Sequence, residues 1–142
     1  MKKILFLSLL FLIATNIQAN DGVEALQDYA EFAEYSDGSI TRAQLESIKS
    51  GNIQYIDTRN KGQYEAGHIP SAINIEWREI LSRLDEVSRD KTVVLYCETG
   101  LLSSKAHLML RIAGRENVKV LWGGYLIWST RETYDESKKV KK

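Results

Sequence analysis

Short runs of apolar residues, several of them β-branched, recur along the chain and are separated by stretches with helical spacing. The runs predict buried strands, and the stretches between them predict amphipathic helices. Strands are expected to begin at Ile40 and to cover residues 53–56, 72–75, 93–96 and 118–121. Helices are expected over residues 23–35, from Thr41 to about residue 50, over residues 60–66, 77–84 and 103–113, and around Trp128. This alternation predicts an α/β fold with a largely parallel sheet.

Two of these helices have recognisable end signals. Thr41 is placed to cap a helix N-terminus, and Gln44 stands three residues later, as a capping box requires. Gly114 follows the helix expected over residues 103–113 and occupies the C′ position, where glycine adopts a left-handed conformation without strain. The short helix expected over residues 60–66 is closed by Gly67. The sequence therefore predicts where these helices start or stop as well as their existence.

The first nineteen residues differ from the rest of the chain. Lys2 and Lys3 precede a largely apolar block at residues 4–13, and residues 14–19 are smaller and more polar. This order is typical of a secretory signal peptide, and the block is too short to span a bilayer comfortably. An uncleaved N-terminal membrane anchor is the alternative. We expect a bacterial protein that is periplasmic or secreted, with no stable membrane insertion once the signal peptide is cleaved.

The expected organisation has four parts: a signal peptide at residues 1–19, a helical extension at 20–38, one α/β domain at 39–130 and a charged tail at 131–142. The chain of 142 residues contains 19 basic and 19 acidic side chains, and loss of Lys2 and Lys3 would leave a slight acidic excess. This balance gives no electrostatic reason to expect nucleic-acid binding.

The most informative stretch is the apolar run that ends at Cys97, the only cysteine of the chain. A short loop around Gly100 and a serine pair, Ser103 and Ser104, follow it before a helical pattern begins. Unpaired N–H groups of such a loop, together with the helix dipole, favour a thiolate and can hold an anionic adduct. After export, a single cysteine is reactive, joined to another molecule, or buried and inert. We expect Cys97 to be a nucleophile.

Three motifs resemble signatures of the rhodanese (sulfurtransferase) family. The first is D-x-R, an aromatic residue and G-H-I-P-x-A-x-N, which the chain carries at residues 57–59 and 64–74. The second is the cysteine loop at residues 94–103, and the third is L-x-G-G-x-x-x-W at residues 121–128. The motifs stand in the family's order, and a chance match to all three is very improbable.

The resemblance implies a rhodanese domain over residues 39–130, with a five-stranded, mainly parallel sheet flanked by helices. It implies a two-step sulfur transfer without a metal or an organic cofactor, in which Cys97 takes a sulfane sulfur from thiosulfate or a persulfide. The resulting Cys97 persulfide passes that sulfur to cyanide or a thiol. The loop that binds the substrate and the persulfide then comprises Glu98, Thr99, Gly100, Leu101, Leu102 and Ser103.

Three further motif residues are expected to have structural roles near the site. Asp57 and Arg59 are expected to form an ion pair that ties a strand end to neighbouring loops, rather than to take part in the chemistry. His68 has the side chain of a general base. In the family's G-H-I-P turn, however, it resembles a residue that packs and hydrogen-bonds.

The cysteine loop departs from many thiosulfate-using relatives. These relatives place an arginine or lysine four or five residues after the cysteine, where this chain has Leu101 and Leu102. An arginine there would help to bind an anionic donor, and Glu98 instead adds a negative charge beside the thiolate. The loop therefore predicts a less charged donor, an organic persulfide, or a protein partner that docks on the leucines.

Two other classes of protein are considered. Phosphatases and arsenate reductases that share the fold need an arginine six residues after the cysteine, where this chain has Ser103. A rhodanese module that binds a protein partner without catalysis is the main alternative. The presence of Cys97 argues against this alternative, whereas Leu101, Leu102 and Glu98 favour it.

Overall fold

A computed structural model describes residues 21–34, 38–49 and 51–130 of the chain. Two compact units are distinguished, residues 1–35 and residues 36–142. In the first unit residues 21–32 are helical, which confirms the helix expected there. Within the described residues, no helix combines the length and the apolar character needed to cross a membrane. The expected signal peptide and charged tail lie outside the described residues.

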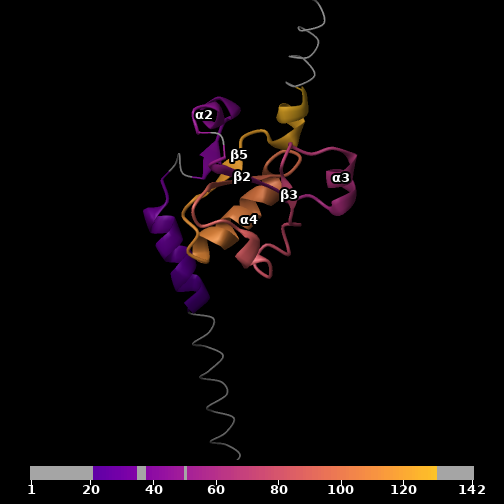
Figure 1. Ribbon diagram of the computed structural model, residues 1–142. Helices are drawn as coiled ribbons and strands as arrows, with labels where there is room; N and C mark the ends of the chain where they lie inside the picture. Colours follow the sequence, from indigo (N-terminus) through magenta and orange to yellow (C-terminus); the bar gives the residue numbers. More distant parts are fainter. Residues whose placement is uncertain (1–20, 35–37, 50, 131–142) are drawn as a thin grey trace, which may run out of the picture. The chain divides into compact units, whose positions relative to one another are not determined.

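The second unit is built on one five-stranded sheet (Figure 1). Its strands are β1 (Ser39–Ile40), β2 (Ile53–Asp57), β3 (Ile73–Asn74), β4 (Thr92–Tyr96) and β5 (Val118–Leu121). They lie in the order β1-β5-β4-β2-β3, and all four neighbouring pairs are parallel. The predicted fold class is confirmed, and each predicted strand is present within a residue or two of its expected ends.

The register of the central strands positions the candidate site. Asp57 at the end of β2 pairs with Tyr96 at the end of β4, and Cys97 follows directly. Because the strands are parallel, their carboxyl ends meet at one edge of the sheet, where ligands bind in folds of this type. The residues that follow β2 and β4 therefore converge although about 40 residues separate them in the chain.

The helices are α2 (Arg42–Glu46), α3 (Lys61–Ala66), α4 (Leu101–Ile112) and a final helix at residues 124–130, with a 3-10 turn, η1 (Leu84–Glu86). Thr41 and Gln44 form the predicted capping box on α2. At the end of α4, Gly114 has φ 76°, and the N–H groups of Gly114 and Arg115 donate to the carbonyls of Arg111 and Leu110. This is the bonding pattern of a Schellman motif, so the predicted C′ glycine is confirmed.

The prediction of a helix over residues 77–84 is wrong. This segment is a series of turns that ends in η1. The Trp77 N–H donates to the Thr58 carbonyl at 3.1 Å, and the Arg83 guanidinium donates to the Asn74 carbonyl at 3.1 Å. Because these contacts tie both ends of the segment to the strands beside it, tertiary structure overrides the helical spacing of its apolar residues.

Two apolar clusters make up the core of this unit. The first consists of Ile56, Ile75, Ile80, Val87, Val93, Leu95, Ala106, Leu110 and Val118. The second consists of Ile40, Leu45, Ile69, Ala72, Val94, Tyr96 and Leu121. Neighbouring residues of β4 alternate between the clusters, because successive side chains of a strand point to opposite faces. The sheet is therefore packed on both faces, and β4 runs through its centre.

Candidate active site

Cys97 lies between the end of β4 and the start of α4, and only 2% of its surface is exposed. The Gly100 N–H donates to the Cys97 Sγ atom at 3.2 Å, and the Ser103 Oγ atom lies 3.7 Å from the same sulfur. Gly100 has φ 111°, a left-handed conformation that favours glycine. The loop thus wraps around the sulfur and directs N–H groups toward it.

These contacts change the acidity of the thiol. Burial alone would raise the pKa of Cys97. The N–H and hydroxyl of Ser103 and the N–H groups of Gly100 and Thr99 outweigh burial, so the pKa of Cys97 lies below its ordinary value. Since the thiolate is the nucleophilic form of cysteine, the loop favours the more reactive state of Cys97.

The Ser103 hydroxyl has two acceptors within reach. It lies 2.9 Å from the Gly100 carbonyl oxygen and 3.7 Å from the Cys97 sulfur. A hydroxyl carries one hydrogen, so Ser103 can donate to either of these atoms but not fully to both. Ser104, by contrast, donates its hydroxyl hydrogen only to the Gly100 carbonyl, at 2.8 Å. Ser103 is therefore the serine of the pair whose hydroxyl can donate a hydrogen bond to the Cys97 sulfur.

Arg59 is the centre of a buried polar cluster beside the loop. Its guanidinium donates to both carboxylate oxygens of Asp57, to the Gly67 carbonyl at 2.7 Å and to the Glu98 carboxylate at 3.1 Å. The same group lies over the ring of Tyr125, 4.2 Å from its centroid. Burial alone would lower the pKa of Arg59, but the acceptors outweigh it and raise the pKa, so the charge is retained.

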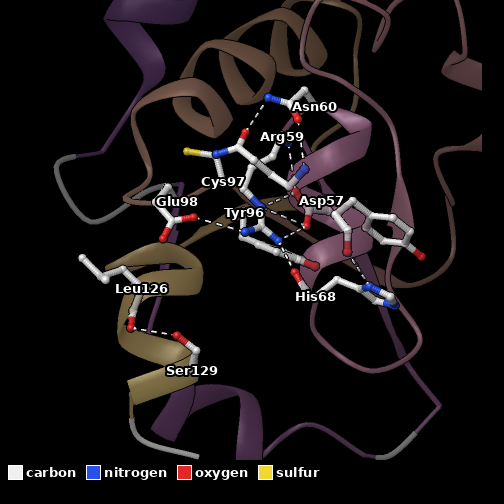
Figure 2. A network of polar contacts seen from close by, with 12 residues as sticks. Asp57, Arg59, Asn60, His68, Tyr96, Cys97, Glu98, Leu126 and Ser129 are labelled. Atoms are coloured by element: carbon white, nitrogen blue, oxygen red, sulfur yellow. Dashed lines mark hydrogen bonds and ion pairs between the residues drawn. The ribbon is translucent and has the colours of Figure 1, made fainter.

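This cluster defines the roles of Asp57, Arg59 and Glu98. Figure 2 shows the Asp57 and Glu98 carboxylates on the Arg59 guanidinium, while the Cys97 sulfur points away from the cluster. Four of the five N–H hydrogens of the Arg59 guanidinium have protein acceptors, and the side chain is only 4% exposed, so Arg59 is largely occupied within the protein. The charge of Glu98 is paired with Arg59, so it opposes a thiolate much less than the sequence suggests.

The segment that starts with the glycine pair after β5 contacts the backbone of the cysteine loop. The N–H groups of Tyr125 and Leu126, in the final helix, donate to the carbonyls of Cys97 and Glu98 at 2.8 and 3.0 Å. Gly124 packs so closely that a Cβ atom there would lie 2.6 Å from both of those carbonyl oxygens. Gly123 and Gly124 belong to the third sequence motif, but the sequence gave no sign of this direct support.

His68 makes its contacts away from the sulfur. Its ring stacks on Tyr64 with centroids 3.9 Å apart, and Nδ1 lies 2.9 Å from the Tyr64 carbonyl oxygen. Pro70 and Ser71 follow in a tight turn, in which the Ala72 N–H donates to the Ile69 carbonyl and Ser71 has φ 66°. His68 therefore packs on α3, which is a structural role.

The remaining loop residues form a rim around the site. Leu101 is 69% exposed, Leu102 is half-buried, and Thr99 is exposed. Trp122 and Leu126, on the supporting segment, are also largely exposed. Among the described residues, no three His, Cys, Asp or Glu side chains gather in a way that would hold a metal ion. The loop and its supporting segment thus expose several apolar side chains, whereas the one charged residue of the loop, Glu98, is paired with Arg59.

Comparison with known proteins assigns the class of this fold and site. Residues 41–131 match the rhodanese-like domain family. The chain is 41% identical over 93 residues to an HTH-type transcriptional regulator of Mycobacterium tuberculosis, a match that covers 63% of this chain and 41% of that protein. It is 31% identical over 78 residues to a sulfurtransferase of Allochromatium vinosum, covering 55% of this chain and 73% of that protein.

Solved structures agree with this assignment. A rhodanese-related protein from Thermoplasma volcanium is 30% identical, with a TM-score of 0.59 over 66% of this chain and 91% of that one. The chain therefore belongs to the rhodanese-like domain family. Sulfurtransferases are among its homologues, while its match to the M. tuberculosis regulator spans about two fifths of that protein.

Proposed function

We propose that this protein is a sulfurtransferase that carries a sulfane sulfur as a persulfide on Cys97. The observation that supports this most directly is the surroundings of the Cys97 sulfur, where loop N–H groups and the Ser103 hydroxyl lower the pKa of the thiol. The same donors suit a terminal persulfide sulfur, which also carries negative charge. Family membership and the sulfurtransferase homologue support the same reaction class.

The transfer consists of two displacements. The Cys97 thiolate attacks the outer sulfur of the donor, the sulfur–sulfur bond of the donor breaks, and its electron pair leaves with sulfite or a thiolate. Cys97 then holds one additional sulfur atom, whose charge the loop N–H groups stabilise. Cyanide or an acceptor thiolate attacks this outer sulfur and releases the Cys97 thiolate. Neither step requires an external oxidant, reductant or cofactor.

Intact mass spectrometry tests this proposal. The purified protein is incubated with thiosulfate and, separately, with an organic persulfide, and then with cyanide. One added sulfur atom that disappears with cyanide, and that Cys97→Ala never acquires, is the expected result. If a folded protein with a reduced thiol takes sulfur from neither donor, it is not a sulfurtransferase.

A partner-binding module without catalysis is the second candidate. The observation that favours it is the exposure of Leu101, on the loop, and of Trp122 and Leu126, on the segment that bonds to the loop, which are 69%, 63% and 50% exposed. Exposed apolar side chains that gather at one place are typical of interaction sites. Under this alternative, Cys97→Ala would leave partner binding intact. In the wild-type protein, Cys97 would never carry an added sulfur.

A further inference from the structure

Two cationic side chains lie on one tryptophan near the cysteine loop. Lys105 Nζ is 4.9 Å from the centroid of the Trp77 ring, and the Arg78 guanidinium carbon is 5.3 Å from the same centroid. Lys105 and Arg78 are exposed, whereas Trp77 is half-buried and packs against the core. None of these three residues belongs to the three sequence motifs.

Backbone contacts place this group at the same edge of the sheet as Cys97. The Trp77 N–H donates to the Thr58 carbonyl at 3.1 Å, and the Thr58 N–H donates to the carbonyl of Tyr96 at 2.8 Å. Tyr96 is the residue directly before Cys97. Trp77 is therefore held at the carboxyl end of the strands by two successive hydrogen bonds.

The position of Lys105 on α4 places its charge next to the loop leucines. Lys105 follows Leu101 by four residues, and both side chains are exposed. Residues four apart lie on the same face of a helix, one turn from each other. Leu101 and Lys105 therefore lie on one face of α4, with Leu101 nearer to the cysteine loop.

The charges near this edge leave both cations available. Glu98 is paired with Arg59, and Arg78 has only a loose contact with Glu76, at 3.8 Å. Within the described part of the chain, no carboxylate lies within ion-pair distance of Lys105. The two cations thus add a local positive potential that the cysteine loop itself does not provide.

We infer that Lys105 and Arg78, held on Trp77, bind the carboxylate of a small persulfide donor. This inference rests on the proposed sulfur transfer and names the class of donor. The Cys97 thiolate attacks the outer sulfur of R–S–SH, the S–S bond breaks, and the electron pair leaves with R–S⁻. The proton of the donor passes to this leaving group, so the products are R–SH and the Cys97 persulfide anion.

The position of the anionic group relative to the transferred sulfur distinguishes this donor from thiosulfate. In thiosulfate the anionic group is bonded directly to the transferred sulfur, so it must lie at the loop, beside Leu101 and Leu102. In the persulfide of a carboxylated thiol, several bonds separate the carboxylate from the transferred sulfur. That spacing allows the sulfur to meet Cys97 while the carboxylate contacts cations one helical turn away.

A matched pair of donors tests the inference. The persulfides of N-acetylcysteine and N-acetylcysteamine differ only in the carboxylate. Single-turnover loading of Cys97 is followed by mass spectrometry at several salt concentrations, with Cys97→Ser as the blank. We expect the wild-type protein to load the carboxylated donor about fivefold more efficiently, which is the effect of one exposed ion pair. Salt is expected to weaken this preference by screening.

Variants then locate the preference. Lys105→Gln and Arg78→Gln should each reduce it, and the double variant should abolish it, while loading from the neutral donor stays unchanged. Lys91→Gln and Arg89→Gln, which remove exposed cations just before β4 at the opposite end of that strand, should have no effect.

Three results would overturn the inference. They are the absence of a preference in the wild-type protein, a preference that survives in the double variant, and an equal loss in the control variants. If neither donor loads Cys97, the proposed sulfur transfer is itself wrong, and the inference fails with it. Loading from both donors without discrimination supports sulfur transfer and rejects only the role of Lys105 and Arg78.

Discussion

The Glu98 carboxylate is paired with the Arg59 guanidinium, with Oε2 and Nη1 3.1 Å apart. Glu98 belongs to the cysteine loop, whereas Arg59 follows β2 and is fixed by Asp57 at 2.6 Å. The pair therefore joins the loop that holds Cys97 to the neighbouring strand. From the sequence, Glu98 was expected to oppose the thiolate. In the structure it links the cysteine loop to Arg59.

Glu98→Ala is expected to lower the free energy of unfolding by about 1 kcal/mol, because a partly exposed ion pair is lost and a buried guanidinium loses an acceptor. Glu98→Gln should recover part of this loss, since its amide oxygen can accept from Arg59. Urea denaturation measures both effects. Glu65→Ala removes an exposed pair with Lys61, whose side chains are 83% and 61% exposed, and should be nearly neutral. Equal losses at positions 98 and 65 would contradict the proposed link.

Ser103→Ala is expected to raise the pKa of Cys97, because the hydroxyl that stabilises the thiolate is removed. The rate of alkylation by iodoacetamide, followed against pH, reports this pKa directly. The whole profile should move to higher pH in Ser103→Ala. Ser104→Ala loses a hydroxyl that bonds only the Gly100 carbonyl, so its profile should match that of the wild type. A shift of the same size in both variants would show that the effect is not specific to the sulfur.

The same pKa predicts the direction of a stability change with pH. The pKa of Cys97 is lower in the folded protein than in an ordinary thiol, so the thiolate stabilises the fold. This stabilisation is complete above the pKa of the unfolded thiol and is lost as the pH falls through the pKa of the folded one. Cys97→Ser, which does not ionise in this range, should therefore lose stability relative to the wild type as the pH rises. Thermal unfolding across this range measures the difference.

Gly124→Ala is expected to destabilise the protein by about 3 kcal/mol or more, because a left-handed φ of 59° is combined with a backbone clash. The added methyl group would displace the carbonyls of Cys97 and Glu98 and should also slow sulfur loading. Gly114→Ala provides the control, since Gly114 has φ 76° but no heavy atom within 4 Å of the position of a Cβ. That variant should lose only about 1–2 kcal/mol and should load normally. Similar losses in the two variants would exclude the close packing of Gly124 as the cause.

Leu101→Arg is expected to increase sulfur transfer from thiosulfate several-fold, because a guanidinium at the rim would bind the anionic donor. Leu101 is 69% exposed, so stability should change by less than about 0.5 kcal/mol. Ile112→Arg places the same charge at the far end of α4 and should leave turnover unchanged. Unchanged thiosulfate turnover in Leu101→Arg would show that the missing basic residue does not limit this reaction.

Local patterns in the sequence were sufficient for most of the fold. The β-branched run before Cys97, the capping box at Thr41 and the glycine at position 114 act within a few residues, so each could be recognised without the rest of the molecule. The segment after Trp77 was misassigned for the opposite reason. Its path depends on hydrogen bonds to Thr58 and Asn74, which lie on other parts of the chain.

The sequence by itself determined the α/β class, the position of Cys97 at a strand end and the loop of N–H groups that follows it. Only the tertiary structure decided which charges meet near that cysteine. The pairing of Glu98 with Arg59, the support from Gly124 and the contact of Lys105 with Trp77 all join segments that are distant along the chain. Periodicity and caps are local properties, whereas electrostatics and close packing depend on distances that exist only once the sheet has brought its strand ends together.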